Sequence, residues 1–169
     1  MRVFTISILI LFTCLHYSCK EFRHKMEVKK VITSFIGKEI IVPDTMILYS
    51  ISGKISNHFI SEDKMKILVY IDGDCSKCVE SLLEWQQFIE NNNDTFLDCS
   101  IVFFITSSNF NLIKNLLNEI KFKYIVVFDY ENAYMLKNNF DNPILNTVLV
   151  DSKNRIVIKE FSFVKSKRK

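Results

Sequence analysis

Two kinds of apolar pattern follow one another along the chain between Lys38 and Phe161. Short runs that are almost entirely apolar are typical of buried strands, whereas apolar residues spaced three or four apart are typical of amphipathic helices. The strand pattern covers Lys38–Val42, Lys66–Asp72, Ser100–Thr106, Tyr124–Asp129, Thr147–Asp151 and Ile156–Phe161. The helix pattern covers Cys78–Glu90, Phe110–Ile120 and Glu131–Asn138.

The order of these elements predicts how the sheet is connected. Strands that alternate with helices pair in parallel through right-handed crossovers, and the polar turn Ser152–Arg155 joins the last two strands as an antiparallel hairpin. The group Ser107–Asn109 supplies an N-cap for the helix that follows it. We therefore predict one α/β domain over residues 38–169, with a mixed central sheet and helices on both of its faces.

Composition and charge narrow the class of protein. The 169 residues are 49% hydrophobic and include only 3 glycines and 2 prolines, which suits packed helices and strands and argues against a turn-rich β-sandwich or a disordered segment. The formal net charge of +3 is too small and too scattered to indicate a nucleic-acid partner. We interpret the basic tail Lys165–Lys169 as solvated, ahead of contact with a membrane or with nucleic acid.

Residues 1–18 have the pattern of a signal peptide. Arg2 precedes an uncharged, mostly apolar run over Val3–Leu15, which is shorter than the roughly 20 residues that a spanning helix needs. Ser18 then precedes Cys19 and a charged stretch. This arrangement resembles the signal of bacterial lipoproteins, which implies cleavage before Cys19 and acylation of its thiol and its freed amine. Such acyl groups hold a protein on a membrane, so the N-terminus predicts a membrane partner.

Other interpretations of this leader stay open. Lipoprotein signals normally have leucine three residues before the cysteine and a small residue two before it, where this chain has His16 and Tyr17. A second register ends at Cys14, with Leu11 in the expected place but a threonine before the cysteine. A secretory leader without lipid and a retained N-terminal anchor helix are further alternatives. We interpret residues 19–37, which follow the leader, as a tether.

The motif Cys75-Ser76-Lys77-Cys78 lies between a predicted central strand and the first turn of a predicted helix. The unpaired N–H groups and the dipole at a helix N-terminus stabilise a thiolate on the first cysteine. The second cysteine lies one turn into the helix, close enough to close a disulfide, so we expect Cys75 to attack and Cys78 to resolve. Lys77 favours the thiolate and Asp74 opposes it, and the sequence leaves their sum open.

A structural disulfide and half of a zinc site are alternatives for this pair. Zinc is disfavoured because there is no second cysteine pair and the histidines lie near the leader or alone, at His16, His24 and His58. We predict no metal and no other cofactor. Cys99 stands alone at the start of an apolar strand, where a buried inert thiol is favoured over a partner in a mixed disulfide.

Taken together, these features resemble the thioredoxin superfamily, and more specifically the envelope-bound thioredoxin-like lipoproteins of Bacteroides-type bacteria. The resemblance extends over Lys38–Phe161 and implies a three-layer thioredoxin-like fold. The segments that carry it are Ile67–Ile71, the Cys75 and Cys78 pair, the helix with Trp85, and Asn146–Asp151.

The resemblance also implies an activity and a location. Proteins of this kind are thiol:disulfide oxidoreductases that exchange electrons with cysteines of exported proteins and with a membrane redox donor. The implied location is the cell envelope, on a membrane-anchored lipoprotein that faces the periplasm or the cell exterior. The catalytic residues implied here are Cys75 and Cys78.

This chain departs from the family at several positions. The family's cis-proline, which helps to hold a substrate beside the cysteine pair, falls at Leu145, and Pro143 lies two residues earlier. With Asn146, these residues are our candidates for the substrate loop. The buried acid that assists proton transfer in the family is replaced by Tyr70, and the tryptophan before the first cysteine is replaced by Asp74.

The family's closing helix is also not predicted, because only Ser162–Lys169, a mostly polar and basic segment, follows the last strand. The sheet face that this helix would cover is then open, covered by the segment between Asp44 and Asp63, or used by a partner. These departures support a second hypothesis from another class. In it the chain is a redox-inactive lipoprotein with a thioredoxin fold that acts as a binding or structural module.

Overall fold

The computed structural model describes residues 23, 25–43, 47–49, 65–96 and 99–158. The chain divides into two compact units, Met1–Phe35 and Ile36–Lys169. In the first unit, residues 23 and 25–35 are helical, a conformation that the sequence did not predict for the tether. The predicted signal peptide and Cys19 lie outside the described residues. No helix in the described ranges has the length and hydropathy of a membrane span.

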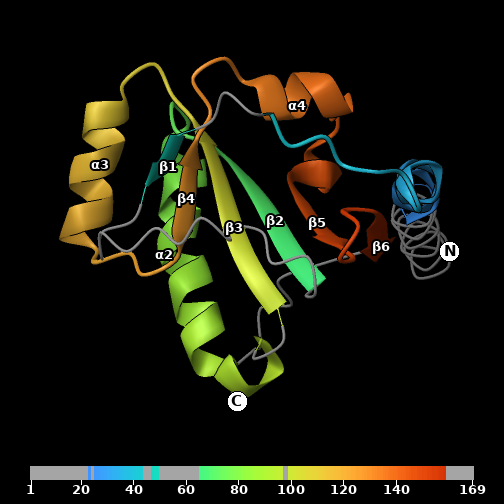
Figure 1. Cartoon of the computed structure of the whole chain (residues 1–169), viewed down its shortest axis with the longest axis horizontal. Coiled ribbons are helices and arrows are strands. Elements are labelled where there is room, and N and C mark those ends of the chain that lie inside the picture. The colour runs from blue at the N-terminus through green and yellow to red at the C-terminus, as the bar shows by residue number, and fades with distance from the viewer. Residues whose placement is uncertain (1–22, 24, 44–46, 50–64, 97–98, 159–169) are drawn as a thin grey trace, which may run out of the picture. The chain divides into compact units, whose positions relative to one another are not determined.

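A mixed sheet forms the centre of the second unit, and its described residues contain six strands in the order β1-β4-β3-β2-β5-β6 (Figure 1). The strands are β1 Ile47–Tyr49, β2 Met65–Asp72, β3 Cys99–Thr106, β4 Ile125–Phe128, β5 Thr147–Val150 and β6 Ile156–Ile158. Strands β2, β3 and β4 pair in parallel, while β1, β5 and β6 pair antiparallel to their neighbours. This confirms the predicted parallel centre and terminal hairpin.

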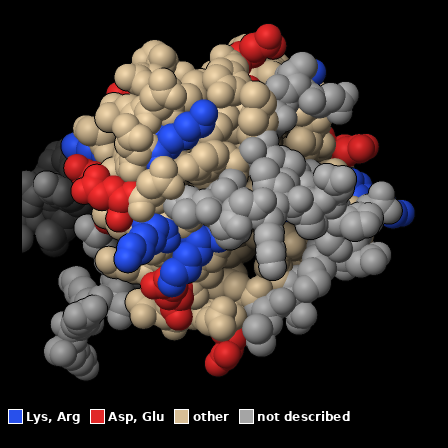
Figure 2. Space-filling view, turned by 60° about the vertical axis from the view of Figure 1, so that its left-hand side comes forward, with Lys and Arg blue, Asp and Glu red and all other residues tan. Residues whose placement is uncertain are grey.

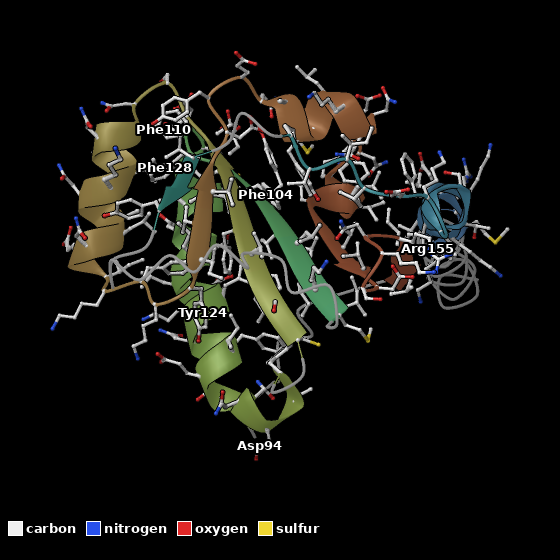
Figure 3. All side chains as sticks on the ribbon, in the orientation of Figure 1. Asp94, Phe104, Phe110, Tyr124, Phe128 and Arg155 are labelled. Atoms are coloured by element: carbon white, nitrogen blue, oxygen red, sulfur yellow. The ribbon has the colours of Figure 1, made fainter. Side chains whose placement is uncertain are left out.

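The helices of this unit lie close to their predicted ranges. They are α2 Ser76–Asn91, α3 Phe110–Glu119 and α4 Ala133–Asn138, with short 3-10 turns at η1 Asn93–Phe96 and η2 Pro143–Asn146. Asn109 is the N-cap of α3, as predicted, because its Oδ1 accepts a hydrogen bond from the Leu112 N–H at 3.2 Å. Phe110 then packs on Phe128 of β4, with ring centroids 5.1 Å apart (Figure 3).

Helices cover both faces of the sheet. Neighbouring residues of a strand point to opposite faces, and β3 shows this with Phe103 and Phe104. Phe103 makes an edge contact with Trp85 of α2 at 5.9 Å, in the same buried cluster as Ile113 of α3. Phe104 stacks on Tyr134 of α4 at 4.2 Å. Thus α2 and α3 lie on one face, α2 behind the strands in Figure 1, and α4 lies on the other, which confirms the predicted three layers.

The predicted first strand, Lys38–Val42, is wrong. This segment forms a single antiparallel bridge, between Glu39 and Arg155, and is otherwise irregular. The side chain of Asn138 binds the backbone of Ile41, donating to its carbonyl at 2.8 Å and accepting from its N–H at 2.7 Å. Backbone hydrogen bonds of 2.8 to 3.0 Å also join residues 37–40 to residues 154–156 around this bridge. The pairing ends at Ile40, because the backbone of the next residue, Ile41, is bound by Asn138 instead, so the apolar run does not form a full strand.

The described part of the segment between Asp44 and Asp63 is the short strand β1, which the sequence did not predict. It pairs with β4 at the edge of the sheet, with Ile47 opposite Phe128 and Tyr49 opposite Val126. Residues 159–169, on which the prediction about the closing helix depends, lie outside the described residues. On the face shown in Figure 2, basic and acidic side chains of the described residues lie next to one another.

Candidate active site

The loop that joins β2 to α2 carries the cysteine pair at the carboxyl end of a central strand. Its first residue, Gly73, donates its N–H to the Thr106 carbonyl at 2.7 Å. A Cβ on Gly73 would lie 2.7 Å from that carbonyl oxygen and 2.9 Å from Cβ of Ser107, closer than real Cβ atoms approach. Glycine is therefore required here because the loop passes so close to the end of β3.

Cys75 is the N-cap residue of α2. Its backbone is extended, with φ −99° and ψ 109°, and its Sγ accepts a hydrogen bond from the Cys78 N–H at 3.4 Å. Its carbonyl also accepts from the N–H groups of Cys78 and Val79, at 2.9 and 3.0 Å. The sulfur of Cys75 thus lies at the positive end of the helix dipole, where a thiolate is stabilised.

Cys78 lies one turn further along and in a different environment. Both cysteines are partly exposed and neither is in a disulfide. Burial, together with the hydrogen bond and charge of Cys75 and the charge of Asp72, raises the pKa of Cys78 to about 11. The second thiol is therefore protonated at neutral pH. The hydrogen bond from the Cys78 N–H to Sγ of Cys75 joins the pair, but the two thiols lie in different surroundings.

Asp74, directly before Cys75, is bound to the turn between β3 and α3. Its carboxylate accepts hydrogen bonds from the Ser107 hydroxyl at 2.9 Å and from the Ser108 N–H and hydroxyl at 3.0 Å. The bond from the Ser108 backbone, with the two serine hydroxyls, lowers the pKa of Asp74 below its usual value. The sequence singled out Asp74 for its charge and as the replacement for the family's tryptophan, but not for these contacts, because its partners lie 33 and 34 residues away.

Tyr70 occupies the position at which the thioredoxin superfamily, which this chain resembles, has a buried acid. Burial first, and then the charges of Asp72 and Asp129, raise the pKa of the Tyr70 phenol to about 12. The Tyr70 phenol is therefore neutral at physiological pH, and it does not supply the ionisable group that the family's buried acid provides for proton transfer. The two carboxylates were not predicted as part of the site. Asp72 could have been noticed, since it lies two residues after Tyr70 and hence on the same face of β2.

The carboxylate of Asp129 is buried just after β4 and holds the start of α4. It accepts hydrogen bonds from the N–H groups of Ala133 and Tyr134, both at 2.8 Å. These groups are unpaired donors at the helix N-terminus, where a negative charge is stabilised by the helix dipole. Asp129 thus connects the end of β4 to α4, the helix on the face of the sheet opposite to α2 and α3.

The substrate-loop candidates form the turn η2, immediately before β5. Pro143 begins the turn and is exposed, Leu145 is buried, and Asn146 is partly exposed. The described residues contain no cis peptide bond, so Pro143 follows a trans bond. In register, the next residue, Thr147, is paired with Val69 of β2, which places the turn beside the strand that leads to the cysteines. Contact with a substrate stays a prediction for all three residues.

Cys99 lies away from the pair. It begins β3 opposite Met65, whereas the cysteine pair follows the other end of β2, where Asp72 is paired with Thr106. Cys99 is partly exposed and is not in a disulfide. Across the described ranges, no group of three or more histidine, cysteine or acidic side chains is arranged to hold a metal ion.

Comparison with solved structures agrees with this geometry. The thioredoxin domain of a thiol-disulfide oxidoreductase from Bacteroides vulgatus superposes with a TM-score of 0.54 at 18% identity, over 75% of this chain and 88% of that one. The chain has a thioredoxin-like fold. A protein assigned as the thiol:disulfide interchange protein DsbE from Chlorobium tepidum gives 0.55 at 14% identity, over 77% and 87% of the two chains.

A third similar structure, StoA from Bacillus subtilis, gives a TM-score of 0.50 at 17% identity, over 70% of this chain and 90% of that one. No family model matches the sequence. No curated protein matches it either. The likeness therefore concerns the thioredoxin-like fold, and the chemistry is argued from this chain's own residues.

Proposed function

We propose that this protein is a thiol:disulfide oxidoreductase and that Cys75 and Cys78 are its catalytic residues. The observation that carries the proposal is the position of Cys75 at the N-cap of α2, with Sγ 3.4 Å from the Cys78 N–H. Both thiols are partly exposed, so a second sulfur can reach them. The thioredoxin-like fold of solved oxidoreductases supports this assignment.

The reaction follows from the difference between the two thiols. The Cys75 thiolate attacks one sulfur of a substrate disulfide, so that a mixed disulfide forms and the other substrate sulfur leaves and takes up a proton. Cys78 then loses its proton and attacks Sγ of Cys75. The second substrate sulfur leaves as a thiolate and is protonated. The substrate gains two electrons and two protons, and the pair becomes a disulfide.

The substrates we propose are cysteine-containing exported proteins, with a membrane redox donor that returns electrons to the pair. The proposal rests on the lipoprotein-type signal over residues 1–18, with Cys19 as the acylated residue. One similar structure is described as a thiol:disulfide interchange protein, which is consistent with this class of partner. The proposed location is the cell envelope, with the domain facing the periplasm or the cell exterior.

Insulin reduction with the purified protein tests the activity. We expect turnover in the wild type and in Cys99→Ala, which lies at the other end of the sheet. Cys75→Ala should abolish turnover. Cys78→Ala should accumulate a mixed disulfide through Cys75, visible as a shift on a non-reducing gel. Wild-type turnover that survives in Cys75→Ala would overturn the proposal.

A redox-inactive binding module remains the second candidate, because Leu145 is buried where the family has its cis-proline and Tyr70 replaces the family's acid. In that case the pair is a locked disulfide. Treatment with a monothiol under native conditions separates the two candidates. A pair that is reduced readily supports the enzyme, and a pair that resists reduction until the protein is unfolded supports the binding module.

Lipid attachment is tested separately by labelling cells with radioactive palmitate. We expect the label in the wild type and in Cys14→Ser, and its loss in Cys19→Ser, because acylation requires the thiol of the first mature residue. Equal labelling in Cys19→Ser would contradict the proposed anchor and would favour the register that ends at Cys14.

A further inference from the structure

The carboxylate before the cysteine pair is held in place by a turn distant in sequence, and this arrangement points to a role in setting the redox equilibrium. We propose that Asp74 is a positioning residue whose fixed negative charge disfavours the Cys75 thiolate and shifts the cysteine pair toward the disulfide, which makes it a better electron donor. This inference rests on the proposed function, since it concerns the same pair.

The position of Asp74 is fixed by contacts on two consecutive residues of the loop. Its carboxylate accepts hydrogen bonds from Ser107 and Ser108 at 2.9 to 3.0 Å, and Gly73 donates to the Thr106 carbonyl at 2.7 Å. In addition, the Asp74 N–H donates to Oδ1 of Asp72 at 3.0 Å. The residue next to Cys75 is thus held by its backbone and by its side chain, so its charge keeps a constant place relative to the sulfur.

The donors that hold the carboxylate are uncharged. Two serine hydroxyls and a backbone N–H stabilise the ionised form, and they lower the pKa of Asp74. They do not cancel its charge as an arginine or lysine would. Asp74 therefore stays negative throughout the pH range in which thiols exchange.

Other charged and titratable groups lie on the elements next to the cysteine pair, and among them the acidic groups outnumber the basic ones. Asp72 ends β2, Asp129 follows β4, Lys77 and Cys78 lie on α2, and Tyr70 lies on β2. The phenol of Tyr70 senses Asp72, Asp129, Cys78 and Asp74 together, and they add to the effect of burial on its pKa. Three carboxylates thus act together at the Tyr70 phenol on β2, while the ammonium nearest in sequence to the pair belongs to the exposed Lys77.

The consequence for redox chemistry follows from which form of the pair is charged. A nearby negative charge raises the free energy of the Cys75 thiolate, whereas the Cys75–Cys78 disulfide is neutral and is little affected. The equilibrium moves toward the disulfide, which is the product when the pair donates two electrons to a substrate disulfide. Oxidoreductases that stabilise the thiolate have the opposite tendency and act as oxidants.

Asp74→Asn in the purified full chain tests the inference, because asparagine keeps the shape and an acceptor oxygen but removes the charge. Labelling of Cys75 with iodoacetamide at pH 6 reports the thiolate without any protein substrate. We expect Asp74→Asn to react about two- to fivefold faster at low salt, a modest factor since the carboxylate is exposed to solvent. The equilibrium with glutathione should move toward the dithiol by a similar factor.

Asp94→Asn is the matched control, since it makes the same change in net charge at the other end of α2 (Figure 3). The 16 residues of α2 place its ends about 24 Å apart, so a charge near Asp94 acts on Cys75 far more weakly than a charge on the adjacent residue. We expect Asp94→Asn to behave like the wild type. An identical increase in both variants would overturn the inference, as would an unchanged rate in Asp74→Asn at low salt.

Salt provides a second measurement that needs no variant. Iodoacetamide is neutral, so salt acts through the surroundings of Cys75, and about 1 M KCl should speed the labelling of the wild type while narrowing its difference from Asp74→Asn. A wild-type rate that falls or stays constant with salt would contradict the role of a negative charge. These readouts are independent of insulin reduction, so an inactive protein with the expected labelling would refute the proposed function alone.

Discussion

At the scale of single residues, the site depends on how differently two neighbouring thiols are placed. Cys75 caps a helix and meets its positive end, while Cys78 lies within the first turn with its thiol partly buried. The two residues are one helical turn apart, so the Cys75 sulfur lies beside unpaired N–H groups at the helix N-terminus, whereas Cys78 is already part of the helix. A pair with two equivalent thiols would lack the order of attack and release that exchange requires.

The raised pKa of Cys78 predicts its reactivity. With a pKa of about 11, only about one thiol in a thousand is ionised at pH 8, and labelling of Cys78 should rise about tenfold for each pH unit until about pH 11. Labelling with iodoacetamide between pH 7 and 11, read by mass spectrometry of the Cys78 peptide, checks this. Full reactivity already at pH 9, the ordinary range of a thiol, would contradict the raised value.

The close passage of Gly73 beside β3 gives a second prediction at this scale. In Gly73→Ala, the new Cβ meets the Thr106 carbonyl oxygen and the Ser107 Cβ, and backbone cannot give way as a flexible side chain can. We expect the free energy of unfolding to fall by about 1–3 kcal/mol and turnover to fall with it, because the loop that holds Cys75 is displaced. Urea unfolding measures the first effect. Ser76→Ala, at the exposed start of α2, is the control and should stay within about 0.5 kcal/mol of the wild type.

At the scale of elements, α4 depends on its two connections to the sheet. Tyr134 stacks on Phe104 of β3, and the Asp129 carboxylate binds the first N–H groups of the helix. The helix has only six residues and its N-cap residue Asn132 makes no side-chain capping bond, so it is too short to be stable by itself. Its stability therefore comes from these tertiary contacts.

Asp129→Ala tests this dependence. The change leaves two buried N–H groups without an acceptor, and we expect unfolding free energy to fall by about 2 kcal/mol. Chemical unfolding followed by circular dichroism measures the loss. Asp94→Ala removes an exposed carboxylate and should change stability by less than about 0.5 kcal/mol. A similarly small change in Asp129→Ala would show that the carboxylate does not hold the helix.

At the scale of the whole molecule, the domain and the preceding segment form separate units. The main buried cluster, which joins α2 and α3 to one face of the sheet, is made entirely of residues from the unit that begins at Ile36. The stacked pair Phe104 and Tyr134 on the other face also lies within it. The second unit thus contains its own core and its own cysteine pair.

This division predicts that residues 36–169 fold without the first unit. We expect the shortened chain to unfold in a single cooperative transition, with a midpoint close to that of the full chain, and to keep insulin turnover. Thermal unfolding followed by circular dichroism, with and without residues 1–35, checks this. A broad transition, or loss of turnover in the shortened chain, would show that the first unit is part of the fold.

The sequence by itself determined the elements whose signal is local. A run such as Ile67–Ile71 is apolar on both sides and so forms a buried strand. Leu82, Trp85 and Ile89 are spaced three and four residues apart, and together they form the buried side of a helix. The cysteine pair follows from the same local order, because its chemistry depends on the junction of that strand with that helix. These predictions needed no knowledge of distant residues.

Tertiary structure alone decided which distant groups meet. Lys38–Val42 has the pattern of a strand but forms only a single bridge, because the backbone of Ile41 is bound by Asn138 and not by a neighbouring strand. Likewise, Asp74 meets Ser107 and Ser108 only because β2 and β3 pair in parallel and end at the same edge of the sheet. Hydrophobic periodicity reports which side of an element is buried. It carries no information about which polar groups from other segments come within hydrogen-bond distance.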